Sequence, residues 1–166
     1  MRGLQHHLHR GLLAALEGIG AVREGHGEGL RMAPVGGPRH LHALVAARHL
    51  LVPLQSEFFA LEGLSQLLQT VERIRVAFNP ELAILGVALT MFDRRNRLSQ
   101  QVSDDVRACL GSVVFDTVVP RNVRLSEAPS HGLPALIYDL RCPGSEAYVR
   151  LARELIGRLP RRAEAA

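Results

Sequence analysis

Three stretches of the sequence carry residues whose types could do chemistry, and each follows or overlaps an apolar run. They are LQSEFFALEG (54–63), LTMFDRRNRLS (89–99) and PRNVRLSEAPSHG (120–132). Arginine in a loop can contact phosphate with a planar, multi-donor head, and asparagine offers a donor and an acceptor to the edge of a base. These residue types permit contacts with nucleotides or nucleic acid, and the alternative is that they form an ordinary solvated surface.

Two other groupings could suggest catalysis or metal binding, but the sequence supports neither. Glu127, Ser130 and His131 lie on one loop, where adjacent side chains rarely point at each other, and no nucleophile elbow is present. The string HHLH (6–9) has no carboxylate or cysteine nearby, which makes it a weak metal signal. We therefore predict no catalytic residue and no metal ligand.

Length and composition bound the class of protein. The chain has 166 residues, of which 47% are hydrophobic, so one globular domain with a proper core is expected. No apolar run approaches the roughly eighteen residues that a membrane helix needs, and no signal peptide is evident. We expect a cytoplasmic protein with no membrane segment, in which Cys109 and Cys142 are reduced thiols.

The basic residues are of one kind. All 20 are arginine, and the formal net charge is +4. A positive charge permits an anionic partner without requiring one. The complete lack of lysine excludes, for this chain acting alone, every mechanism that needs a lysine, such as a Schiff base or a P-loop lysine.

The first 40 residues differ in texture from the rest. They hold 9 of the 15 glycines and 5 of the 8 histidines. A short helix is expected over residues 11–19, and a loop or disordered stretch from about Gly18 to His40, because closely spaced glycines weaken regular structure. We divide the chain into an irregular segment (1–40), a folded part (41–160) and a tail (161–166).

From Leu41 on, the hydrophobic pattern predicts alternating strands and helices. Apolar residues at three- and four-residue spacings predict an amphipathic helix over 61–78, with Leu61 to Phe78 forming one stripe. Further helices are expected at 41–48, 99–111 and 143–159, and strands at 49–54, 83–91, 112–120 and 134–140.

Local signals indicate where these helices end and which residues they bury. Asn79–Pro80 closes the helix over 61–78. Ser99 is a plausible N-cap and Gly111 a plausible end for the helix between them. In the last helix, the residues expected to face inward are Tyr148, Leu151, Leu155 and Leu159.

Strands that are apolar on both sides and separated by helices predict an α/β fold, with a parallel sheet flanked by helices. In such sheets, ligands bind beyond the carboxyl ends of the strands. The three polar loops follow strands that end near Pro53, Leu89 and Val119. We therefore expect them to meet at one edge of the sheet and to form a site there.

The order of three strings carries a resemblance to a known family. They read HALVAARHLLVPLQSEFFALEGLSQLL (42–68), GVALTMFDRRNRLSQQV (86–102) and VVPRNVRLSEAPSHGLPALIYDLRCPGSEAYVRLARELI (118–156). The chain resembles the ParA/Soj-type chromosome and plasmid partition ATPases, relatives of the MinD cell-division ATPases. The resemblance covers about residues 42–157 and implies the C-terminal part of a P-loop NTPase fold.

The resemblance also implies how intact members of the family work. They bind ATP and Mg²⁺, form a homodimer with nucleotide between the subunits, and bind DNA nonspecifically, which makes them nucleoid-associated. A ParB-type partner stimulates hydrolysis and releases them from DNA. This cycle positions chromosomal or plasmid cargo.

By resemblance, four arginines are candidate DNA contacts: Arg95 and Arg124 in the matching positions, with Arg94 and Arg121 adding to the positive field. Such contacts are blind to base sequence and weaken steeply with salt. The alternative is that they are solvated surface arginines, some paired with the acidic residues Asp93, Asp104 and Glu127.

The resemblance places a nucleotide between the same loops. The candidate contacts to the adenine base are Thr90, Met91, Pro120 and Asn122, with ordinary strand-end packing as the alternative. Gln55 and Glu57 are expected near the dimer interface and the nucleotide, as interface or switch residues. Glu57 could equally be an acidic residue favoured at a helix N-terminus.

The chain departs from the family before residue 41. The sequence there reads MAPVGGPRHL, with no KGGVGKT-like loop, no Walker A lysine and no Walker B-type aspartate. Out-of-frame codons joined to a true C-terminal half, or a truncated paralogue, would each explain this. We expect weak or no ATP binding and defective hydrolysis, and the alternative function is a non-enzymatic dimerisation or regulatory module acting on an intact paralogue.

Overall fold

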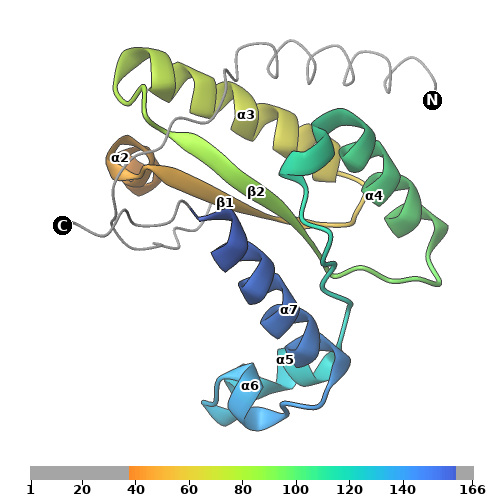
Figure 1. Ribbon diagram of the computed structural model, residues 1–166. Helices are drawn as coiled ribbons and strands as arrows, with labels where there is room; N and C mark the ends of the chain where they lie inside the picture. Colours follow the sequence, from red (N-terminus) through yellow and green to blue (C-terminus); the bar gives the residue numbers. More distant parts are fainter. Residues whose placement is uncertain (1–37, 160–166) are drawn as a thin grey trace. The chain divides into compact units, whose positions relative to one another are not determined.

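A computed structural model of the chain describes residues 38–159 (Figure 1). In chain order its elements are α2 (Pro38–Ala46), β1 (His49–Gln55), α3 (Ala60–Ala77), β2 (Ala83–Thr90), α4 (Arg97–Leu110), η1 (Gly111–Val113), α5 (Val123–Glu127), η2 (Ala128–His131), α6 (Ala135–Tyr138) and α7 (Pro143–Arg158). The two η elements are short 3₁₀ turns. The helix expected over 11–19, the HHLH string and the tail 161–166 lie outside the described residues.

The described chain divides into two compact units. One comprises residues 38–51 and 61–85, and the other comprises residues 52–60 and 86–159. Each of the strands β1 and β2 therefore contributes its first residues to one unit and its last residues to the other. The candidate site residues named above all fall in the unit that contains 52–60 and 86–159.

The first unit has a small apolar cluster. Leu44 from α2, Val71 and Ile74 from α3, and Leu82 are its buried members. The side-chain amide of Asn79 donates to the backbone oxygens of Leu44 (3.0 Å) and Ala47 (2.7 Å). Asn79 therefore satisfies carbonyls at the C-terminal end of α2, which would otherwise lack partners.

The stripe of the long helix is confirmed except at its end. Leu64, Leu68, Val71 and Ile74 are all at most 4% exposed, whereas Phe78 is 71% exposed. The helix α3 stops at Ala77, and Phe78 N still donates to Ile74 O (2.8 Å), but the Phe78 side chain lies in solvent, so the prediction that it faces inward is wrong.

The predicted strands 49–54 and 83–91 are confirmed as β1 and β2, which are hydrogen-bonded neighbours. The backbone N–H of Ala83 donates to Arg48 O (2.9 Å), and the N–H of Ser56 donates to Thr90 O (3.0 Å). Residue numbers increase in the same direction along both strands between these two hydrogen bonds, so the strands are parallel. Residues 86–89 of β2 are buried in succession, as in a strand covered on both faces.

The strand expected at 112–120 is only partly present. Phe115 N donates to Val87 O (2.9 Å), and Val119 N donates to Leu89 O (2.9 Å). From Phe115 to Val119 the segment therefore advances four residues over the length in which β2 advances two, from Val87 to Leu89. The residues between the two hydrogen bonds bulge out of the ladder. The prediction of one continuous strand is wrong because of this bulge, although isolated parallel bridges hold both ends of the segment to β2 or the residues just after it.

The strand expected at 134–140 is also wrong. Ala135–Tyr138 is the short helix α6, in which Tyr138 N donates to Pro134 O (2.9 Å) and Asp139 N donates to Ala135 O (3.0 Å). Local hydrogen bonds of this kind satisfy the backbone without a neighbouring strand.

Two helix boundaries differ from expectation, and a third agrees with it. The helix expected at 41–48 is confirmed as α2, but it begins at Pro38, inside the stretch expected to be irregular. The side chain of Asn96, rather than that of Ser99, caps α4 by accepting from Leu98 N (2.9 Å). Gly111 ends this helix as expected, in a positive-φ conformation (54°) that suits glycine.

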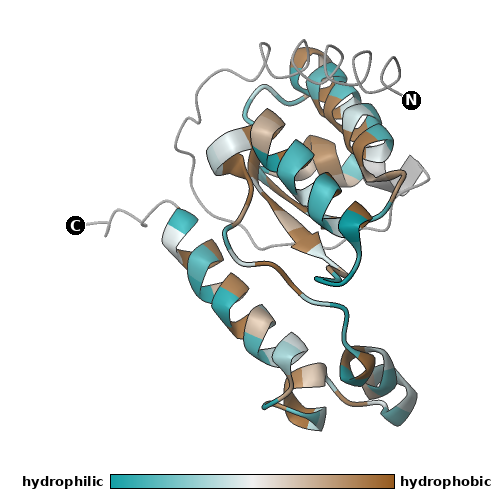
Figure 2. Cartoon of the chain, turned by 90° about the vertical axis from the view of Figure 1, so that its right-hand side faces the viewer, coloured by the Kyte–Doolittle hydropathy of each residue, from teal (hydrophilic) through white to brown (hydrophobic). Residues whose placement is uncertain are grey.

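The closing helix is confirmed as α7, with a narrower buried face than expected. Leu151 is 7% exposed, but Tyr148 and Leu159 are 44% and 38% exposed. Figure 2 shows apolar and polar residues alternating around this helix, which ends at the grey C-terminal trace. In the part of the chain that the structure describes, no helix is long and apolar enough to span a membrane.

Candidate functional site

A pocket of about 300 Å³ lies at the carboxyl ends of the two strands. Its lining comes from the segment after β1, the segment after β2, the start of α4 and the segment after Pro120, and consists of Ser56, Glu57, Phe58, Met91, Asp93, Asn96, Leu98, Ser99 and Arg121. The structure thus brings parts of the three polar loops together, at the sheet edge where a site was expected.

Ser56 and Ser99 are buried polar residues of this pocket, and Ser56 is the more deeply buried. It is 1% exposed, and its hydroxyl has no hydrogen-bond partner among the described residues. Its backbone oxygen accepts a hydrogen bond from the Ser99 hydroxyl (3.0 Å), which ties the β1 loop to α4. A buried hydroxyl without a partner is costly unless something else supplies the hydrogen bond.

Met91 ends β2 in a strained conformation. Its φ is 53°, and it is the only non-glycine residue with positive φ in the described chain. Residues other than glycine rarely adopt a positive φ, and backbone strain of this kind is concentrated at functional sites. Thr90, just before it, uses its hydroxyl to donate to Leu54 O (3.3 Å), which fixes the strand ends together.

The four candidate base contacts do not all reach the pocket. Met91 lines it, whereas Thr90, Pro120 and Asn122 do not. Pro120 forms a parallel bridge with Phe92. Asn122 caps α5, because its side-chain oxygen accepts from Arg124 N (2.9 Å). Its oxygen is therefore committed to the backbone, and only its amide hydrogens remain for a ligand.

The interface or switch candidates lie beside the pocket. Glu57 lines it and is exposed, and Gln55 is the exposed last residue of β1. Glu57 precedes α3, which begins at Ala60, and its backbone oxygen accepts from Ala60 N (3.0 Å). It therefore occupies the turn that leads into the helix, where a negative charge is favourable.

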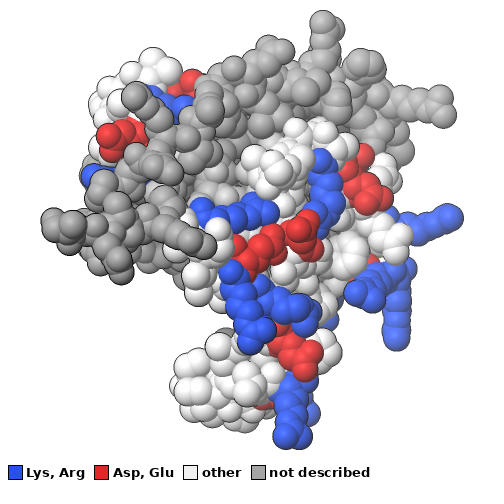
Figure 3. All heavy atoms as spheres, in the orientation of Figure 1, with Lys and Arg blue, Asp and Glu red and all other residues white. Residues whose placement is uncertain are grey.

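The loop after β2 presents arginines to solvent. Asp93 holds the turn, since its carboxylate accepts from Arg95 N (2.9 Å). Arg94, Arg95 and Arg121 are exposed, and no ion pair engages their side chains among residues 38–159. Figure 3 shows basic side chains projecting on the side where this loop lies in Figure 1.

Arg124 is held differently. Its Nη1 lies 3.0 Å from a Glu127 carboxylate oxygen, and its Nε lies 3.7 Å from an Asp139 carboxylate oxygen. The same Glu127 oxygen accepts from the Tyr138 hydroxyl (3.2 Å), and the Tyr138 ring stacks on His131 at 4.9 Å. The hydrogen bond that Arg124 donates to Glu127 raises the pKa of Arg124. His131 thus has an aromatic neighbour.

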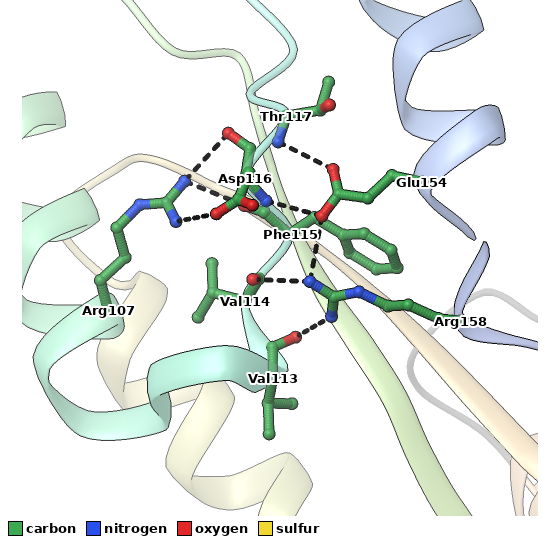
Figure 4. A network of polar contacts seen from close by, with 8 residues as sticks. All are labelled: Arg107, Val113, Val114, Phe115, Asp116, Thr117, Glu154 and Arg158. Carbon is green, nitrogen blue, oxygen red and sulfur yellow. Dashed lines mark hydrogen bonds and ion pairs between the residues drawn. The ribbon is translucent and has the colours of Figure 1, made fainter. Parts of the chain in front are cut away.

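A polar network from α4 and α7 holds the bulged segment that leads to Pro120 (Figure 4). Arg158 donates to Val113 O and Val114 O (both 3.0 Å) and lies over the Phe115 ring, with 4.0 Å between the guanidinium carbon and the centroid. Arg107 donates to Phe115 O (2.9 Å).

Glu154 completes this network by capping the bulge. Its carboxylate accepts from Asp116 N (2.8 Å) and Thr117 N (3.0 Å), and Arg158 pairs with it at 3.0 Å. Burial acts to raise the pKa of Glu154, but the two backbone donors and the charge of Arg158 outweigh it, so the pKa lies below its ordinary value. The side chains of α4 and α7 thus replace strand pairing along the bulge.

Sequence reasoning missed Ser56, Asp93 and Asn96 as parts of the site. The signal for Asn96 was present, because an asparagine before an apolar-periodic run is a strong N-cap. Nothing in the local sequence showed that the Ser56 hydroxyl would lack a partner. Within the described chain, no group of three or more histidine, cysteine, aspartate or glutamate side chains could hold a metal ion.

Comparisons with known proteins bear on this site. A family model described as an AAA domain matches residues 32–84. The chromosome partitioning protein ParA of Caulobacter vibrioides is 62% identical over 118 residues, which are 71% of this chain and 44% of that protein. The chromosome-partitioning ATPase Soj of Treponema pallidum is 51% identical over 118 residues, 71% of this chain and 47% of that protein.

The matched part of the chain is homologous to proteins named ParA or Soj that act in chromosome partitioning. The sporulation initiation inhibitor protein Soj of Bacillus subtilis, 50% identical over 69% of this chain and 46% of that protein, agrees with this. The chain spans less than half the length of these ParA/Soj proteins.

Solved structures support the fold. Cobyrinic acid a,c-diamide synthase from Mycobacterium smegmatis, with bound ADP and magnesium, is 30% identical and has a TM-score of 0.53 over 70% of this chain and 40% of that one. The same enzyme has also been solved with an ATP analogue and magnesium. The α/β class, as the C-terminal part of a P-loop NTPase fold, is therefore confirmed.

Proposed function

We propose that the chain acts in chromosome partitioning as a nonspecific DNA-binding member of the ParA/Soj family. The observation that carries this proposal is the set of exposed arginines Arg94, Arg95 and Arg121 beside the pocket, with no ion-pair partner among the described residues. Arginine heads of this kind bind phosphate oxygens without reading base sequence. The family resemblance assigns Arg124 to the same DNA-binding surface. Binding to DNA would hold the chain at the nucleoid.

DNA binding is tested with a short fluorescent duplex of arbitrary sequence and the full chain. Arg95→Ala and Arg124→Ala should each weaken binding about equally on all sequences and lower the salt slope by about 1. Arg150→Ala is the matched control, because Arg150 is an exposed arginine on α7 with a long 4.0 Å pair to Glu146. If all three variants bind like the wild type, the proposed DNA surface is wrong.

We also propose that the pocket takes the base of a nucleotide. The buried Ser56 hydroxyl lacks a partner and the strained Met91 lines the same space, which supports a ligand there. Thr90, Pro120 and Asn122 would shape the strand ends around it, and Gln55 and Glu57 would lie toward a dimer partner. ATP with Mg²⁺ supplies phosphate-transfer chemistry in the intact family.

The chain lacks the groups that the resemblance assigns to the phosphates of ATP and to Mg²⁺. The chain has no lysine, and no metal-binding group occurs among residues 38–159. We therefore infer that the chain is defective in ATP hydrolysis and binds adenosine about as well as ATP. Isothermal titration with both ligands tests this. ATP binding more than about tenfold tighter than adenosine would mean that the chain does hold phosphates.

A second candidate function is a non-enzymatic module that associates with an intact ParA/Soj protein, as homodimer subunits do. The observation that favours it is that the given chain, 62% identical to a partitioning protein over 118 residues, contains no lysine. Co-purification with an intact ParA/Soj protein, followed by its DNA release on adding a ParB-type partner, distinguishes this role from DNA binding by the chain alone.

A further inference from the structure

The cluster around Arg124 carries an inference that rests on the proposed DNA binding. Arg124 is the one arginine of the candidate DNA surface that is engaged by two carboxylates. Its side chain is 55% exposed, so it remains within reach of a phosphate. The three charges of Arg124, Glu127 and Asp139 sum to −1, which opposes the approach of a DNA phosphate.

We propose that Glu127 is a built-in competitor for DNA phosphate at Arg124. A carboxylate and a phosphate oxygen accept the same donors in the same fork geometry. Glu127 takes the Nη1 edge of the guanidinium at 3.0 Å, and Asp139 faces Nε at 3.7 Å. A phosphate that binds both edges must displace these carboxylates or share the donors with them.

The structure also explains why Glu127 stays in place. The Tyr138 hydroxyl donates to the same carboxylate oxygen (3.2 Å), so Glu127 is held from α6 as well as from its own helix α5. His131 stacks on the Tyr138 ring with an interplanar angle of 22° and limits its movement. The competitor is therefore positioned before DNA arrives, and its displacement lowers the affinity at Arg124.

The test is Glu127→Gln in the full chain, with binding to a short fluorescent duplex at low salt. Glutamine keeps an oxygen for Tyr138 and Arg124 but removes the charge. Because an exposed ion pair is weak, the gain should be small, and E127Q should bind DNA about two- to fivefold more tightly. Glu146→Gln, which removes a charge from the exposed pair with Arg150 on α7, should change the affinity less.

The double variant separates the inference from the proposed function. The gain in E127Q should vanish when Arg124 is replaced by alanine. If R124A weakens binding but E127Q gives no gain, Glu127 is not a competitor and the DNA surface stands. If the gain survives in the double variant, the charge acts elsewhere and the inference is overturned. If R124A has no effect, or neither the wild type nor E127Q binds, DNA binding at Arg124 fails with it.

Discussion

The ring of Phe115 occupies the space in which a side chain at Gly86 would stand. An ideal Cβ at Gly86 would lie 2.3 Å from the ring carbon Cε2 and 2.7 Å from Cζ. Phe115 is fully buried, and Arg158 covers its ring at 4.0 Å. The ring therefore has little room to move away. Close packing of β2 against the bulged segment depends on the absence of a side chain at residue 86.

Gly86→Ala should destabilise the protein. Overpacking of this kind typically costs about 1–3 kcal/mol in the free energy of unfolding. Gly63→Ala is the matched control, because its Cβ would meet nothing within 4 Å in the interior of α3. That change should stabilise the helix by about 0.5–1 kcal/mol. Urea unfolding measures both, and equal midpoints for the two variants would contradict the packing argument.

Ser56→Ala should leave the stability of the unliganded chain unchanged or raise it. The Ser56 hydroxyl has no partner among residues 38–159, so its removal relieves the cost of a buried unsatisfied group of about 1–3 kcal/mol. Ser145 is also fully buried, but its hydroxyl donates to Ala135 O (3.2 Å), so Ser145→Ala should destabilise. Thermal melting compares the two, and a clear loss of stability in S56A would show that its hydroxyl already has a partner.

Arg158→Ala should destabilise the fold more than Arg158→Lys. Alanine leaves the carbonyls of Val113 and Val114 without their donor, at a cost of about 1–3 kcal/mol. Lysine keeps a cation near Phe115 but cannot reproduce the planar fork that reaches both oxygens. Urea unfolding should therefore rank wild type, R158K and R158A in that order. Full recovery with lysine would mean that charge alone matters.

The contribution of Glu154 to stability should depend on pH. Its pKa is lower in the folded chain than in the unfolded chain, because Asp116 N, Thr117 N and Arg158 favour the charged form over the effect of burial. The unfolded state therefore binds the proton more readily in acid. This contribution is fully present above the unfolded value of about 4.3 and is lost as pH falls through the folded pKa.

Glu154→Gln is the comparison that isolates this effect. The difference in unfolding free energy between wild type and E154Q should be constant near neutral pH and should shrink as pH falls below about 4. Urea unfolding at a series of pH values measures it. A difference that grows in acid would show that the folded pKa is raised rather than lowered.

The sequence predicted the elements whose signals are periodic or local. The strands β1 and β2, the buried stripe of α3 and the glycine end of α4 follow from patterns within each segment. The bulge between Phe115 and Val119 does not, since it depends on Glu154 and Arg158 from a helix some forty residues later in the chain. The strand expected at 134–140 failed for a different reason, because apolar residues alone do not distinguish a short helix from a strand.

The site was predictable in place but not in detail. Parallel strands bring their carboxyl ends to one edge, so the meeting of the loops around Met91 and Arg121 followed from the fold class. The hydrogen-bond and ion-pair partners of individual side chains could not be predicted from the fold class. Asn122 uses its oxygen to cap α5, and Arg124 is bound by carboxylates of which one lies fifteen residues away. The Asn122 cap and the Glu127 pair are local, whereas the contact between Arg124 and Asp139 has no signature in the local sequence.

Proline at position 53 makes the two hydrogen-bonding edges of β1 different. Ser56 N–H points to β2, and alternate residues of a strand turn their backbone groups to opposite sides, so Pro53 turns away from β2. Proline has no N–H to offer there. If a second copy of the same strand paired with this edge, the hydrogen bond donated by residue 53 would be missing in the middle of the ladder. Pro53 therefore disfavours fibre formation by edge-to-edge pairing of β1 strands.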